Sequence, residues 1–214
     1  TMKRISKVMN RTNQGAMIDL HSANQYNPKD GFANSANLYL EHFPYLDRLW
    51  FGEYFYFDFP PEFWLVEVSG FPYGLMGEML EGGGNPWRGM LYGMTGRSPR
   101  AVIGPRLKLC DSVGMQNRDM SGYGVKAYLV KTGSDKTLAT VYSHMGDKAL
   151  ISLATWEDTD AKVKLSIDWA KLGLDPSKVT LHAPAIENFQ QETTWKPGDE
   201  IVVPKGKGLF IIAK

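Results

Sequence analysis

The chain has 214 residues, of which 43% are hydrophobic and 22% are charged, a composition that is ordinary for a globular protein. Its 24 basic and 23 acidic residues leave a formal charge of +1, so no net electric field favours a nucleic acid or an anionic membrane as partner. Cys110 is the single cysteine, which excludes an intrachain disulfide, and no apolar run is long enough to span a bilayer.

The first half of the sequence predicts alternating helices and strands. The expected elements are a helix over 2–13, a strand over 15–21, a helix over 32–43, a strand over 48–55, an extended piece over 63–68, a short helix over 71–80, a strand over 88–95 and a helix from Ser98 or Gly104 to about Val113. Strands that alternate with helices form a parallel sheet, so this half is predicted to be α/β with three strands.

The second half changes character, because period-two alternation dominates from Val125 onward. The expected strands are Val125–Lys131, Thr137–Ser143, Lys148–Ala154, Ala161–Asp168, Val179–Ala183, Glu200–Val203 and Gly208–Ala213. Short strands with this spacing, separated by Gly, Asp and Pro turns, predict an antiparallel β-sandwich. We therefore expect two domains, residues 1–119 and residues 120–214.

The stretch from Asp47 to Tyr92 is unusually rich in aromatic rings, carboxylates and glycines. It interleaves Trp50, Tyr54, Tyr56, Trp64, Tyr73 and Trp87 with Glu53, Asp58, Glu62, Glu67, Glu78 and Glu81. Aromatic faces pack against the C–H faces of sugars, carboxylates bind sugar hydroxyls, and two carboxyl groups across a glycosidic bond are what its hydrolysis requires. The stretch indicates a carbohydrate site.

Asp19 and Glu53 are the best candidates for a catalytic acid/base or nucleophile pair. Each is expected at the carboxyl end of a strand, where barrel enzymes place their active sites. Aromatic neighbours would desolvate Glu53 and raise its pKa, which suits a general acid. The structural alternatives are an Asp19 that caps the backbone and a Glu53 that pairs with Arg48 or Arg88.

A second group of side chains is predicted to bind the substrate: His21, Trp50, Tyr54, Trp64, Glu67, Glu78 and Trp87. Glu78 is expected in an apolar helix, where a structural ion pair is the alternative to a binding role. At least one of the three tryptophans is expected in the core. The four histidines have no zinc-site spacing and no phosphate loop follows Gly82–Gly84, so we expect neither a metal nor a cofactor.

Several motifs give the chain a resemblance to a known family. The segments IDLHSANQYNP, LWFGEYF and WLVEVSGFPYGLMGEMLEGGGNPWRGMLYGM resemble bacterial glycoside-hydrolase-like proteins related to β-N-acetylgalactosaminidases, and so does the tail from ALISLATW to KPGDEIVVPKGKG. The resemblance implies the C-terminal portion of a (β/α)8 barrel followed by an antiparallel β-sandwich, with the three strands as the sixth to eighth of the barrel. It also implies an adjacent Asp-Glu catalytic pair on an earlier strand, and the barrel-like part here has no such pair.

These observations predict a glycosidase, or the C-terminal part of one, that acts on polysaccharide or glycan by carboxylate catalysis. The alternatives are a non-catalytic carbohydrate-binding protein and a truncated structural protein. Three parallel strands cannot close a barrel, so we expect the exposed sheet edges to be covered by self-association or by the aromatic loop at 54–64. Full-length relatives are expected to be periplasmic or secreted, although the first residues here lack the apolar core of a signal peptide.

Overall fold

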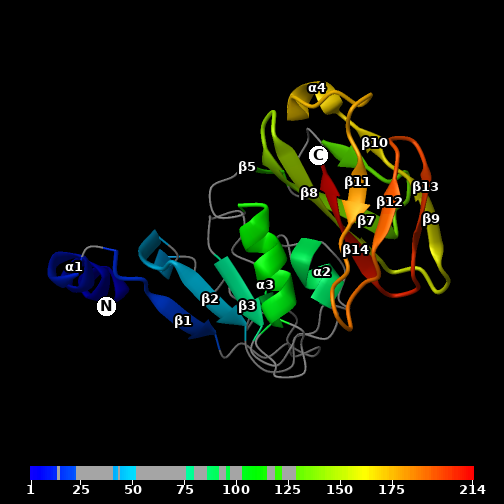
Figure 1. Cartoon of the computed structure of the whole chain (residues 1–214). Coiled ribbons are helices and arrows are strands. Elements are labelled where there is room, and N and C mark those ends of the chain that lie inside the picture. The colour runs from blue at the N-terminus through cyan, green and yellow to red at the C-terminus, as the bar shows by residue number, and fades with distance from the viewer. Residues whose placement is uncertain are drawn as a thin grey trace. The chain divides into compact units, whose positions relative to one another are not determined.

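The computed structural model describes residues 1–13, 15–22, 41–42, 44–51, 76–79, 86–91, 95–96, 103–114, 119–121 and 129–214 (Figure 1). The chain divides into two compact units, Thr1–Ala101 and Val102–Lys214. The first contains parallel strands with helices, and the second is built almost wholly of antiparallel strands. Each unit is described by itself.

The first unit begins with the amphipathic helix α1, Met2–Thr12, which confirms the helix predicted over 2–13. A four-stranded sheet follows, made of β1 (Asp19–Ser22), β2 (Arg48–Phe51), β3 (Met76–Met79) and β4 (Thr95–Gly96) in that order. Every neighbouring pair of these strands is parallel. The predicted parallel sheet is therefore present, with four strands rather than three.

Two predictions for the first unit are wrong. The helix expected over 71–80 contains strand β3, because GLMGEML carries two glycines that disfavour a helix and reads as the apolar run of a buried parallel strand. The strand expected over 88–95 is replaced at its start by helix α2, Pro86–Leu91, in which proline occupies the first turn. The extended piece over 63–68 and most of the helix over 32–43 lie outside the described residues.

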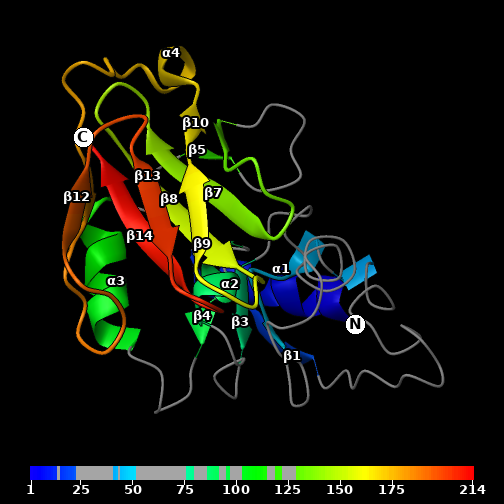
Figure 2. The ribbon, with the colours of Figure 1, turned by 90° about the vertical axis from the view of Figure 1, so that its right-hand side faces the viewer.

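The second unit opens with helix α3, Ile103–Ser112, as predicted, and continues into strands. These are β5 (Asp119–Ser121), β6 (Val130–Lys131), β7 (Thr137–His144), β8 (Lys148–Thr155), β9 (Ala161–Lys164), β10 (Ser166–Ile167), β11 (Leu181–Ala183), β12 (Thr193–Trp195), β13 (Glu200–Val203) and β14 (Gly208–Ala213), with the short helix α4 (Trp169–Leu172) after β10. Six strands pair in the order β12-β11-β14-β8-β7-β5, and the pairs β10-β6 and β13-β9 form a second layer (Figure 2).

The core of the second unit lies between these two layers. Ala149, Ile151 and Leu153 alternate along β8 and are at most 1% exposed, and Val163 and Ile201 contribute to the same cluster from the second layer. Alternation of this kind places every second side chain of a strand on one face of its sheet. The predicted sandwich is therefore present, with its core where the period-two pattern indicated.

The other face of the six-stranded sheet is also buried, and helix α3 covers part of it. Leu150 and Phe210 on this face are fully buried. The Arg106 guanidinium of α3 lies 5.5 Å from the centre of the Phe189 ring, and Lys148 Nζ donates a hydrogen bond of 3.1 Å to the Ser112 carbonyl. These contacts explain why the division between the units falls before α3, at residues 101–102, and not at the boundary expected near residue 120.

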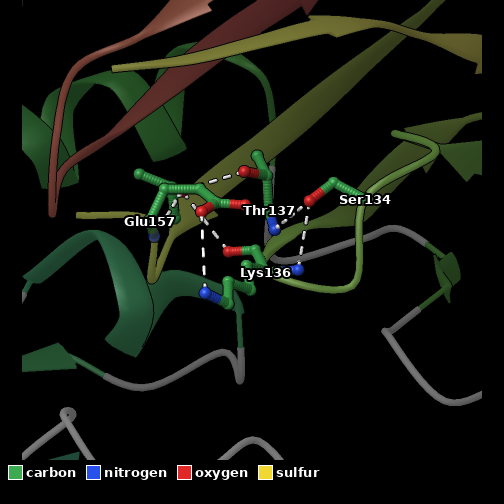
Figure 3. A network of polar contacts seen from close by, with 5 residues as sticks. Ser134, Lys136, Thr137 and Glu157 are labelled. Carbon is green, nitrogen blue, oxygen red and sulfur yellow. Dashed lines mark hydrogen bonds and ion pairs between the residues drawn. The ribbon is translucent and has the colours of Figure 1, made fainter. Parts of the chain in front are cut away.

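A polar network fixes the register of the β7–β8 hairpin at its open end (Figure 3). The hydroxyl groups of Thr137 and Thr155 are buried and lie 2.8 Å apart, and Glu157 N–H donates to the Thr155 hydroxyl at 3.1 Å. The Ser134 hydroxyl accepts hydrogen bonds of 3.1 Å from the backbone N–H groups of Lys136 and Thr137. The Lys136–Glu157 ion pair, at 3.8 Å and largely exposed, adds little. This network is structural, because its hydroxyl groups satisfy one another and the backbone.

Candidate functional site

Three of the predicted substrate-binding residues fall in one row across the parallel sheet. His21 of β1 is in register with Trp50 of β2, Trp50 is in register with Glu78 of β3, and Glu78 is in register with Thr95 of β4. Each of the first three is the third residue of a four-residue strand. Because the strands are parallel, this row lies near the carboxyl edge of the whole sheet, which is where parallel sheets carry their binding sites.

Asp19 stands at the other end of its strand. It is the first residue of β1, in register with Arg48, and is exposed, whereas the sequence pattern predicted it at the carboxyl end. The apolar residues before it do not form the strand. Instead, Ile18 N–H donates to Asp47 Oδ2 at 2.7 Å and the Asp47 N–H donates to the Ile18 carbonyl at 3.0 Å. At about 3.3 Å of rise per residue, the Asp19 row lies ~10 Å before the last row of the sheet, Ser22–Phe51.

The remaining predicted site residues are divided between helix α2 and segments that the structure does not describe. Glu53, Tyr54, Trp64 and Glu67 lie outside the described residues. Trp87, at the start of α2, is half-buried, and the helix contacts β4. The structure therefore brings His21, Trp50 and Glu78 into one row and places Asp19 in the same sheet.

Sequence reasoning did not single out Thr95, the fourth member of the row. Strand β4 has only two residues, which is too short to give an alternation signal. The pairing of Glu78 with Thr95 across β3 and β4 is visible only in the register of the sheet.

No metal site and no membrane-spanning helix is found within the described ranges. In that part of the chain, no group of three or more His, Cys, Asp or Glu side chains is arranged to hold an ion. None of its helices combines the length and the apolar character needed to cross a membrane.

Comparisons with known proteins connect this geometry to a family. Residues 1–99 match the family model "Glycoside hydrolase 123, TIM-barrel domain", and residues 104–214 match "Glycoside hydrolase 123, C-terminal domain". No curated protein sequence matches the chain. A solved structure, a GH27 β-L-arabinopyranosidase from Geobacillus stearothermophilus, is similar in fold with a TM-score of 0.53 at 8% identity, over 100% of this chain and 53% of that one.

The chain thus spans about half the length of that solved enzyme. The first family match ends at residue 99 and the second begins at residue 104, and the division between the two compact units falls between them in the sequence. They also confirm the resemblance of the sequence motifs to glycoside-hydrolase-like proteins. Because the C-terminal family model alone covers more than half of the residues, the chain belongs to the glycoside hydrolase 123 family.

Proposed function

We propose that this chain takes part in the hydrolysis of O-glycosidic bonds in a polysaccharide or glycan, with its sugar site at the carboxyl edge of the β1–β4 sheet. The observation that carries the proposal is the row of His21, Trp50 and Glu78, one residue from the end of three adjacent parallel strands. An imidazole, an indole and a carboxylate in one row supply hydrogen bonding, a stacking surface and an acid or base. Membership of a hydrolase family favours hydrolysis over non-catalytic binding.

The fold that fits this function is a (β/α)8 barrel followed by a β-sandwich. Its support is the uninterrupted parallel order of β1 to β4, with helix α2 between β3 and β4, as a barrel requires. The match to a TIM-barrel family model and the likeness to a solved glycosidase agree with it. In such a barrel the sheet edge that carries Glu78 would form part of the mouth.

Among the carboxylates, Glu78 is the strongest candidate for a role in the chemistry. It stands in the row near the carboxyl edge, whereas the Asp19 row lies ~10 Å before the last row of the sheet. Glu53 comes two positions after Phe51, the last residue of β2, in the sequence, and lies outside the described residues. We infer that Glu78 is better placed than Asp19 to act on a bond at the carboxyl edge of the sheet, while Glu53 stays a candidate from the sequence.

Hydrolysis of a panel of aryl glycosides tests the proposal, and the panel includes N-acetyl-β-galactosaminides because the sequence resemblance points to them. Glu78→Gln and Glu53→Gln are expected to lower kcat by about 10²-fold or more, the scale of positioned proton transfer. Asp19→Asn is expected to have a smaller effect. Glu187→Gln, an exposed carboxylate of the second unit, serves as the control. Wild-type rates in Glu78→Gln, or no hydrolysis of any aryl glycoside by the wild-type chain, would overturn the proposal.

A further inference from the structure

The second unit carries a groove that the hydrolase site does not use. It encloses about 580 Å³ and its lining comes entirely from residues 186–209. Strand β12 is the edge of the six-stranded sheet and β13 is the edge of the β13-β9 pair, so the groove opens where the two layers of the sandwich end side by side. We propose that this groove is an accessory binding site for a neutral oligosaccharide chain.

One wall of the groove is aromatic. Trp195 of β12 is in register with Leu181 of β11, so it belongs to the inner face of its sheet and packs against the edge of the core. It nevertheless remains half-buried and lines the groove, together with Val202 of β13, which is 45% exposed. An indole that is held by the core on one side and open on the other is a rigid surface for the apolar face of a sugar ring.

Other residues of the lining supply neutral hydrogen-bonding groups. Asn188, Gln191 and Thr193 are exposed side chains of the lining, and each can donate and accept hydrogen bonds as sugar hydroxyls require. Lys207 is the single charged residue of the lining. This composition fits a neutral glycan better than an anionic one, which would need a cluster of cations.

The groove is preformed, because its loop is closed by a bridge and is tied to strand β14 through the Gln190 side chain, whose Oε1 accepts from the Phe210 N–H at 2.8 Å. Residues Ile186 and Gln190 form a bridge, with Ile186 N–H donating to the Gln190 carbonyl at 2.9 Å and Gln190 N–H donating back at 3.0 Å. Asn188, between them, has a left-handed backbone with φ +56° that the turn holds. A preformed site loses little conformational entropy on binding, which a shallow groove needs in order to retain a flexible sugar chain.

This inference goes beyond the proposed hydrolysis, and its test measures binding without turnover. Affinity electrophoresis of the full chain in gels that contain xylan, glycol chitin, galactan or hydroxyethyl cellulose gives a dissociation constant for each neutral polysaccharide. We expect retardation by at least one of them. Trp195→Ala is expected to raise that dissociation constant at least tenfold, and the double variant Gln191→Ala/Thr193→Ala at least threefold.

The matched control is Trp169→Ala, because Trp169 also packs partly buried against the same core but does not line the groove. It should be retarded like the wild-type protein. Melting curves identify any variant that loses its fold, and if Trp195→Ala does so, the double variant decides, since both of its side chains are exposed. The proposal is wrong if no gel retards the wild-type chain, or if the folded groove variants are retarded as strongly as Trp169→Ala.

Discussion

Among the polar side chains of the second unit, Gln190 is predicted to contribute most to the free energy of unfolding. Strand β14 pairs with β8 along its whole length, but with β11 only through Ile212 and Ala213. On the open side of Phe210, the Gln190 side chain takes the place of a strand. Its Oε1 accepts from the Phe210 N–H at 2.8 Å, and its Nε2 donates to the Phe210 carbonyl at 3.0 Å and to the Pro184 carbonyl at 2.7 Å.

Gln190→Ala removes these three hydrogen bonds and leaves backbone groups of a buried strand without their partners. At about 1 kcal/mol of net stability for each bond, we expect a loss of ~3 kcal/mol in the free energy of unfolding. For a unit of roughly 100 residues, that corresponds to a fall of about 10 °C or more in Tm. Gln190→Glu should also be strongly destabilising at neutral pH, because a carboxylate would face two carbonyl oxygens that it cannot bond to.

Urea unfolding of the full chain, followed by tryptophan fluorescence, measures the loss in Gln190→Ala. Gln191→Ala is a matched control, since Gln191 is the next residue and is exposed, and its effect should stay within about 0.5 kcal/mol. A Gln190→Ala variant within about 0.5 kcal/mol of the wild type would refute the argument that this amide completes the sheet. An equal loss in Gln191→Ala would refute it as well.

Three further predictions concern the same unit. Gly173→Ala should lower the free energy of unfolding, measured in urea, by ~2–3 kcal/mol, because φ is +69° and a Cβ would lie 3.0 Å from Gly146 N. Gly133→Ala is the control, since Gly133 also has a positive φ of +76° but open space around it, and it should lower the free energy of unfolding by only about 1 kcal/mol. The hydrogen bond from the Lys171 side chain lowers the pKa of Asp168. The Asp168 carboxylate therefore contributes to stability above about pH 4, and this contribution is lost as pH falls through the lowered pKa. When Tm is measured from pH 5 to 2, it should fall less in Asp168→Asn than in the wild type. A chain of residues 103–214 should have a free energy of unfolding in urea ~3 kcal/mol higher than a chain of residues 120–214. The shorter chain loses the buried side chains of Leu109 and Val113 and the contact of Arg106 with Phe189. Equal urea midpoints for the two chains would show that the 103–114 segment is dispensable.

The sandwich was predictable because the burial of residues along its strands follows the alternation of apolar and polar residues in the sequence. In β9 and β13, buried and exposed residues alternate at every position, and that alternation is what the sequence shows. In β8, by contrast, seven successive residues are buried, because helix α3 covers part of the face that the second layer does not. The apolar run KALISLA still predicts a strand there, but it does not predict which element packs on the second buried face of that strand.

The errors in the first unit have a different origin. Strand β3 has four residues and β4 has two, so neither is long enough for a period to be recognised. The expected position of Asp19 near the carboxyl end of a strand is wrong, because β1 begins at Asp19, whereas its catalytic role stays a prediction. Asp19 is therefore three residues, or ~10 Å, before the carboxyl end of its strand at Ser22.

The row of His21, Trp50 and Glu78 illustrates why a candidate site is harder to predict than a sheet. The three residues were each selected for their chemistry, but they are separated by 29 and 28 positions in sequence and meet only through the register of two strand pairs. Register in a parallel sheet is set by the connecting segments and by packing on both faces, and neither is encoded next to the residues themselves. The groove beside Trp195 has the same property, since its walls come from edge strands of two different layers. Local pattern therefore identifies which side chains are suited to bind a sugar, while long-range pairing decides which of them can bind the same one.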